Sequence, residues 1–257
     1  MTDSEADHRP ADPGLRNRLT IADAFTLGNA ACGFLAICSI AALLRDPSTS
    51  GDALLSSRRP ATAIMLLLIG AACDLLDGPL ARRLGGSVMG AHLDNLADAI
   101  SFGLAPAFLV VAWGSHSAAN PAERAFAVAA ATLCMLAVVL RLARFAAVPG
   151  EYGVFCGLPC PMGALTVVSI VLLDPPVIPA ALAIAGVALM MVSKITFPKP
   201  HGPSAVLVLL WIAFCVCCLS CYALGLPGAD GLIQTCAYLQ IILTLVIPLG
   251  MRRAIRA

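Results

Sequence analysis

The sequence predicts an all-α protein, a polytopic bundle of transmembrane helices, from three observations. Its composition is 60% hydrophobic and only 12% charged, whereas soluble domains are about half apolar with roughly a quarter of their residues charged. Its mean hydropathy is +0.90. Long apolar runs recur along the chain, and several reach the roughly 20 residues that a membrane span needs once their flanks are included.

Eight helices are expected, each built on one apolar run with its flanks. The first follows residues 1–18, a polar stretch that we interpret as a disordered cytosolic tail because it has no apolar core. Gly85-Gly86 separates the second helix from the third, and Asp174-Pro175-Pro176 separates the two shortest, the fifth and the sixth. The expected ranges are 21–44, 60–83, 89–113, 122–146, 159–173, 176–194, 204–224 and 231–251.

Basic residues set the expected orientation in the membrane. With the N-terminus inside, twelve of the sixteen Lys and Arg residues fall on the cytoplasmic side, as the positive-inside rule requires. The four on the other side are Arg45, Arg58, Arg59 and Arg124. A net charge of only +1 argues against a nucleic-acid partner.

The eleven cysteines raise the alternatives of a disulfide framework or a metal cluster. Most lie inside expected spans, where cysteine acts as a small apolar residue. The group from Cys215 to Cys221 lacks ordinary zinc-site spacing. We therefore expect these side chains to serve packing.

Four aspartates, Asp74, Asp77, Asp94 and Asp98, lie within 25 residues of this apolar chain. At about 100° per residue, each pair falls on one face of its helix. Ionisable groups inside a membrane are costly and usually functional, and facing carboxylates repel unless a cation balances them. Oxygen ligands suit hard divalent cations, so the pattern predicts two ions, Mg²⁺, Mn²⁺ or Ca²⁺.

The turn between the two aspartate helices is expected to be tight. Gly85 and Gly86 permit a sharp reversal, and Ser87 is expected to cap the following helix. The two helices would then be antiparallel neighbours with their carboxylate faces together.

These residues resemble the signature of the CDP-alcohol phosphotransferase family, D-x-x-D-G-x-x-A-R, seven or eight residues, then G-x-x-x-D-x-x-x-D. Here the signature runs from Asp74 to Asp98 with a gap of seven. The resemblance implies that Asp74, Asp77 and Asp94 bind metal and that Asp98 completes the second site. It also implies that Asp98 is the catalytic base, taking a proton from the acceptor hydroxyl.

The resemblance further implies a nucleotide site between the helices. Gly78 and Ala81 could instead serve close packing between helices. The side chain of Arg82 could instead extend along the apolar surface so that its charge reaches the membrane interface. The expected nucleotide contacts are Thr26, Asn29, Gly78, Ala81, Arg82 and Gly90.

Neighbouring strings resemble the serine-using branch of that family: "LDNLADAISFGLAPAF" (93–108), "RLARF" (141–145) and "FCGLPCPMGALTV" (155–167). This implies transfer of the phosphatidyl group of CDP-diacylglycerol to L-serine, giving phosphatidylserine and CMP. Serine carries a carboxylate that an Arg fork would bind. The expected acceptor contacts are Arg141, Arg144 and Pro159.

Family members often have six core helices. We therefore expect a catalytic membrane domain over 19–200 and a transmembrane extension over 201–257. We also expect a homodimer that contacts membrane lipid in the plasma membrane of a prokaryote, with its active site facing the cytoplasm.

Three alternatives stay open at this point. The acceptor could be glycerol phosphate or inositol phosphate, although those need more basic residues than Arg141 and Arg144 supply. The donor could be an ether lipid. A divalent-cation transporter is the remaining alternative, although transport predicts acids spread over several helices.

Overall fold

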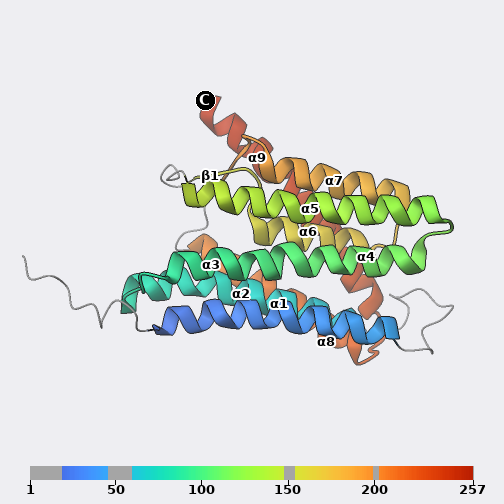
Figure 1. Ribbon diagram of the computed structural model, residues 1–257, viewed down its shortest axis with the longest axis horizontal. Coiled ribbons are helices and arrows are strands. Elements are labelled where there is room, and N and C mark those ends of the chain that lie inside the picture. Colours follow the sequence, from blue (N-terminus) through green and yellow to red (C-terminus); the bar gives the residue numbers. More distant parts are fainter. Residues whose placement is uncertain (1–18, 46–59, 148–153, 199–202, 257) are drawn as a thin grey trace, which may run out of the picture.

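The computed structural model describes residues 19–45, 60–147, 154–198 and 203–256, which form a bundle of long helices (Figure 1). The predicted tail, 1–18, lies outside these residues. Two three-residue strands are also present, β1 (Val154–Cys156) and β2 (Thr196–Pro198). The helices are α1 (Ile21–Arg45), α2 (Pro60–Leu84), α3 (Gly90–Asp98), a π-helical turn η2 (Ala99–Leu104), α4 (Ala105–Ser117), α5 (Pro121–Ala147), α6 (Cys160–Leu172), α7 (Val177–Val192), α8 (Pro203–Ala223) and α9 (Ala229–Arg256).

The eight expected helical segments are confirmed, and the third is less regular than expected. It runs from Gly90 to Ser117 as α3, η2 and α4 without a break. The π-helical turn begins directly after Asp98. Such turns inside α-helices occur frequently at functional sites.

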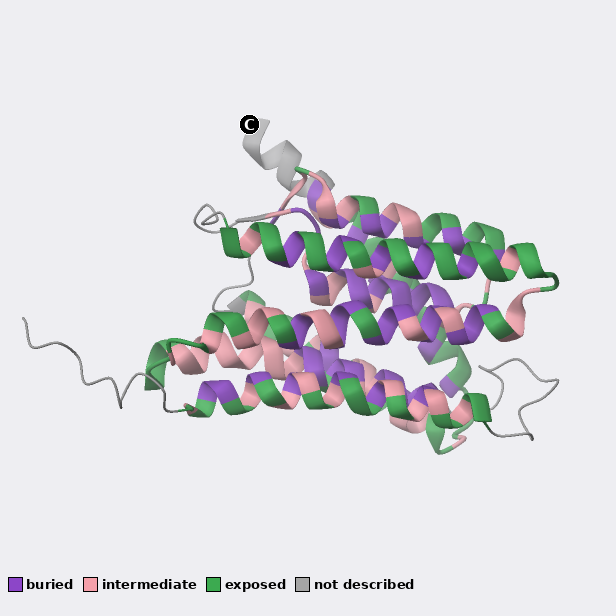
Figure 2. Cartoon of the chain, viewed as in Figure 1, coloured by how far each residue is buried: buried purple, intermediate pink, exposed green. Residues whose placement is uncertain are grey.

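The lengths of the helices and their exposed apolar side chains confirm the prediction of a membrane protein. In the part of the chain that the structure describes, six helical segments are long and apolar enough to cross a membrane. Large apolar side chains such as Phe34, Leu182 and Leu207 are exposed, and Figure 2 shows exposed positions along the outer faces of the helices. Water would disfavour so much exposed apolar surface, whereas lipid accommodates it. The protein is therefore an integral membrane protein.

The interior is packed by aromatic and branched side chains that lose almost all contact with the surroundings. Trp113, Phe102 and Phe197 are the largest of these. Helix α1 packs along α2 and α5 along α7, whereas α8 packs against α2 and α9 against α6. All eleven cysteines are free thiols.

The small sheet was not expected from the sequence. Strands β1 and β2 pair antiparallel, with Phe155 opposite Phe197. Next to it, the Gly157 N–H donates to the Ile195 carbonyl at 2.8 Å. Gly157 has φ +84°, and a Cβ there would lie 2.2 Å from the Met191 carbonyl oxygen, so only glycine fits. The sheet and this contact hold the start of α6 against the end of α7.

Candidate active site

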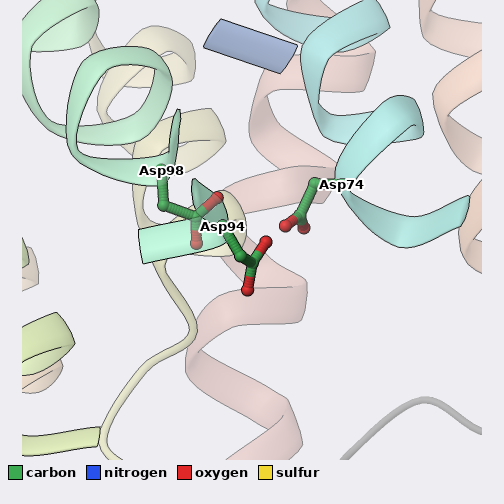
Figure 3. Close-up of side chains that lie close together, drawn as sticks. All are labelled: Asp74, Asp94 and Asp98. Carbon is green, nitrogen blue, oxygen red and sulfur yellow. The ribbon is translucent and has the colours of Figure 1, made fainter. Parts of the chain in front are cut away.

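Three of the four predicted metal ligands meet at one place. Asp74 comes from α2, and Asp94 and Asp98 come from successive turns of α3. One carboxylate oxygen of each lies within 4.8 Å of the other two, and Figure 3 shows the three carboxylates pointing toward one another. The i, i+4 spacing of Asp94 and Asp98 puts both on one face of α3. Their carboxylates lie close to that of Asp74 on α2, although α3 packs mainly on α1 and not on α2.

The residues at this place fit a divalent cation. The Oδ1 atom of Asp94 is buried and has no hydrogen-bond partner among the described residues. A buried carboxylate oxygen without a partner is costly, and three converging carboxylates repel one another. A hard cation bound by oxygen ligands removes both costs.

Asp77, the fourth aspartate, is not part of this group of three. Its Oδ2 atom accepts a hydrogen bond from Thr26 Oγ1 at 2.8 Å. The same hydroxyl lies 3.2 Å from the Ala22 carbonyl oxygen, and its single proton serves one acceptor at a time. A metal role for Asp77 therefore stays a prediction.

Thr26, Asn29 and Gly33 of α1, spaced as T-x-x-N-x-x-x-G, contact the aspartate helices. The Asn29 amide donates from Nδ2 to Asp98 Oδ1 at 3.2 Å. Ser101 Oγ donates to the Asn29 backbone carbonyl at 2.7 Å. A Cβ on Gly33 would lie 2.6 Å from Ser101 Oγ, so glycine permits this close approach of α1 and η2. Thr26 and Asn29 thus orient two aspartates, and their contact with a nucleotide stays a prediction.

The remaining expected nucleotide residues surround the turn between α2 and α3. Gly78 and Ala81 are half-buried, whereas Arg82 is exposed. The Arg82 guanidinium passes 3.5 Å from where a Gly78 Cβ would lie. Their position at the aspartate end is compatible with the expected role, which stays a prediction.

Ser87 does not cap α3, so that expectation is wrong. Met89 occupies the cap position and makes no side-chain cap bond. The Ser87 hydroxyl donates instead to Asp23 Oδ1 at 2.9 Å. Asp23 is a buried acid in the first turn of α1 that the sequence reasoning missed. The spacing of Thr20 and Asp23, which resembles a capping box, was the available signal.

The expected acceptor residues lie at the same end but differ in exposure. Arg141 is buried, and Arg144 is exposed. The Arg141 guanidinium donates from Nη1 to Cys160 Sγ at 3.1 Å and lies 5.1 Å from the centre of the Phe145 ring. It also interacts electrostatically with Asp74. Pro159 is half-buried at the cap of α6. Cys160 was missed because a cysteine in an apolar chain is ordinarily a packing residue.

Several curated proteins resemble this chain. It is 31% identical over 198 residues to an archaetidylserine synthase of Methanothermobacter thermautotrophicus, covering 76% of each chain. It is 35% identical over 187 residues to a CDP-diacylglycerol–serine O-phosphatidyltransferase of Methanocaldococcus jannaschii, covering 72% of this chain and 77% of that one. A Bacillus subtilis protein of the same name is 30% identical over 180 residues, which cover 69% of this chain and 90% of that protein.

The model of the CDP-alcohol phosphatidyltransferase family matches residues 19–196. This range begins just before α1 and ends at β2, so it contains all the aspartates of the site and the two expected acceptor arginines, Arg141 and Arg144. The match covers well over half of the chain, and the expected family resemblance is confirmed. The protein belongs to the CDP-alcohol phosphatidyltransferase family.

Proposed function

We propose that this protein transfers the phosphatidyl group of CDP-diacylglycerol to the hydroxyl of L-serine, giving phosphatidylserine and CMP. The observation that carries the proposal is the convergence of Asp74, Asp94 and Asp98 in the family signature, with one buried Asp94 oxygen unpaired among the described residues. The names of the relatives in M. jannaschii and B. subtilis support serine as the acceptor.

In this proposal the aspartates hold the cations and one of them moves a proton. Asp74, Asp77 and Asp94 are metal ligands, and Asp98 completes the second site. Two divalent ions, Mg²⁺ or Mn²⁺, when bound, neutralise the pyrophosphate and stabilise the leaving CMP. Convergent oxygen ligands in an apolar surrounding support this assignment.

Asp98 is the base of the proposed reaction. Its carboxylate takes the proton from the serine hydroxyl as the serine oxygen bonds to the lipid-side phosphorus and the bond from that phosphorus to CMP breaks. The Asn29 amide, which donates to Asp98 Oδ1 at 3.2 Å, holds one oxygen and so orients the carboxylate. A base held in this way needs little rearrangement to reach the acceptor.

Arg141 is the better candidate for binding the serine carboxylate. It is buried at the aspartate end, whereas Arg144 is exposed. An arginine offers five N–H donors in a planar fork, which matches a carboxylate. Pro159 caps α6, and Cys160, the first residue of that helix, accepts a hydrogen bond from Arg141.

An ether-lipid donor is a second candidate. The relative in M. thermautotrophicus is an archaetidylserine synthase, and that name supports a donor other than a diacyl lipid with serine unchanged as acceptor. Membership of a transferase family argues against the divalent-cation transporter.

We also propose the arrangement in the membrane. Residues 19–200 form the catalytic domain, 201–257 form a C-terminal extension, and the protein is a homodimer in a prokaryotic plasma membrane. The family match, which ends at residue 196, supports the division. Exposed Arg82, Arg83 and Arg144 at the aspartate end support a cytoplasmic active site.

The test uses purified protein in detergent with Mg²⁺ or Mn²⁺, diacyl and ether CDP-lipids, and labelled serine, ethanolamine, glycerol phosphate or inositol phosphate. We expect CMP release with serine, and far less with ethanolamine because it lacks the carboxylate. Asp98→Asn should reduce turnover at least about 100-fold while CDP-lipid binding persists. CMP release with a phosphorylated alcohol and none with serine would overturn the acceptor assignment.

A further inference from the structure

We propose that Asp23 is a positioning residue, which ties the first turn of α1 to the turn between α2 and α3 and so sets where α3 presents Asp94 and Asp98. The inference rests on the proposed function, in which those two side chains bind a cation. Asp23 itself lies outside the family signature that runs from Asp74 to Asp98.

Both carboxylate oxygens of Asp23 accept hydrogen bonds. Oδ2 accepts from the Thr20 backbone N–H at 2.7 Å and from the Thr20 hydroxyl at 2.9 Å. Oδ1 accepts from the Ser87 hydroxyl at 2.9 Å. Asp23 is only 2% exposed, whereas Thr20 and Ser87 are half-buried, so these bonds are partly shielded from solvent. A charged acceptor strengthens each of them.

The turn that Asp23 holds has little other support. Leu84, Gly85 and Gly86 are exposed, as are Val88 and Met89. Gly85 has φ +90° and nothing within 4 Å of where a Cβ would lie. Among the side-chain bonds of the described residues, the Ser87 bond to Asp23 is the one that joins this turn to another helix. Removing it leaves the turn held by its own backbone.

Gly90 brings α3 close to the same carboxylate. A Cβ on Gly90 would lie 3.3 Å from Asp23 Oδ1 and 3.5 Å from Ser87 Oγ. The first residue of α3 therefore packs directly on the Asp23 and Ser87 pair. The signature glycine thus has a role in this contact, in addition to its expected nucleotide contact.

Helix α3 carries a displacement at Gly90 to the metal ligands. Asp94 lies one turn after Gly90, and Asp98 lies one turn further. Because Gly90, Asp94 and Asp98 lie on one continuous helix, a shift at its start moves both carboxylates relative to Asp74 on α2. Metal–ligand distances tolerate only about 0.2 Å, so a small shift weakens cation binding.

The experiment measures Mn²⁺ binding to the full chain in detergent by electron paramagnetic resonance, together with CMP release against Mn²⁺ concentration. The variants are Asp23→Ala, Ser87→Ala, Ser87→Thr and the double alanine variant. Asp230→Ala is the matched control because Asp230 is an exposed acid in the first turn of α9. Hydrogen exchange of residues 85–92 reports on the turn independently of metal and of activity.

Asp23→Ala and Ser87→Ala are each expected to raise the Mn²⁺ midpoint, the Mn²⁺ concentration that gives half-maximal binding, about tenfold. A loss of about tenfold in metal affinity is the usual lower bound when a residue that supports the metal ligands is lost. Hydrogen exchange in the turn should quicken in both. Turnover at saturating Mn²⁺ should change much less. Ser87→Thr keeps the hydroxyl and should restore the midpoint, and the double variant should be no worse than Asp23→Ala because both remove one contact. Asp230→Ala should match the wild type.

Unchanged midpoints and unchanged turn exchange in both single variants would overturn the positioning role. So would losses that add in the double variant, or a Ser87→Thr variant as weak as Ser87→Ala. A wild-type protein that neither binds Mn²⁺ nor releases CMP would instead overturn the proposed function. The wild type therefore tests the function, and the variants test Asp23.

Discussion

The aspartate end of the bundle and the contacts of α8 and α9 both contain buried polar side chains, but these are satisfied in different ways. In the contacts of α8 and α9, the hydroxyls of Thr166 and Thr244 lie 2.8 Å apart and join α6 to α9. Trp211 Nε1 donates to Gln240 Oε1 at 3.1 Å, joining α8 to α9. These polar atoms find partners within the protein, as buried polar groups generally do.

The aspartate end leaves buried acceptors without partners. Among the described residues, Asp94 Oδ1 and Asn29 Oδ1 have none, and the carboxylates of Asp74 and Asp98 crowd beside them. A complete polar pair costs little and joins helices, whereas an incomplete set costs stability until a ligand binds. The polar groups at the contacts of α8 and α9 therefore stabilise the fold, whereas those at the aspartate end are suited to bind cations and substrate.

The largest expected effect follows from removing charge at the incomplete site. Asp94→Asn preserves the shape of the side chain but removes its charge, and we expect CMP release to fall about 1,000-fold. Cation-mediated charge stabilisation is worth several kcal/mol, and each 1.36 kcal/mol is tenfold in rate. The rate is measured with CDP-diacylglycerol, serine and saturating Mg²⁺.

Asp174→Asn is the matched control for this prediction. Asp174 Oδ1 accepts from Trp113 Nε1 at 2.6 Å and from Ser117 Oγ at 3.2 Å. An asparagine oxygen can accept the same two bonds, and asparagine tolerates the positive φ of 44° at this position. Turnover near the wild-type value is expected. An equal loss in both variants would erase the distinction between complete and incomplete polar sets.

A smaller effect is expected where α1 supports the site by close packing. Gly33→Ala would put a Cβ 2.6 Å from Ser101 Oγ and 2.7 Å from Ser101 Cα. The π-helical turn η2 must then shift, and Asp98 directly precedes it. We expect turnover to fall about tenfold, because misplacement of about 1 Å costs up to 100-fold. Overpacking should also cost about 1–3 kcal/mol of stability.

Gly186→Ala is the comparison for Gly33→Ala, measured by the same CMP assay and by thermal unfolding in detergent. Gly186 lies within α7, and nothing lies within 4 Å of where its Cβ would be. Alanine also has the higher helix propensity, so stability should hold or rise. A Gly33→Ala variant as active and as stable as Gly186→Ala would show that α1 does not position Asp98.

The sequence predicted the helices well because each depends on a local apolar run. The second helix was expected at 60–83 and is observed at Pro60–Leu84. The grouping of Asp74, Asp94 and Asp98 also followed from spacing, since the carboxylates repeat at helical intervals on two helices that share one short turn.

Contacts between residues distant in the chain were not predictable in this way. Asp23 and Ser87 are 64 residues apart, and Arg141 and Cys160 lie on different helices. The strands β1 and β2 have three residues each and lie in the connections between helices, so they are too short to show a strand pattern in the sequence. No local periodicity encodes such pairs, because they depend on how whole helices pack.

The smallest effect is expected in the complete polar set, where α9 meets α6. Thr244→Val removes one hydroxyl of the Thr166 pair, but Thr166 Oγ1 still donates to the Met162 carbonyl at 2.7 Å. Since hydrogen bonds between membrane helices average about 0.6 kcal/mol, we expect a loss below about 1 kcal/mol in thermal unfolding. CMP release should stay within about twofold of the wild type. A Thr244→Val variant that folds but loses turnover would show that α9 contributes to the active site. The proposed boundary near residue 200 between the catalytic domain and the C-terminal extension would then be wrong.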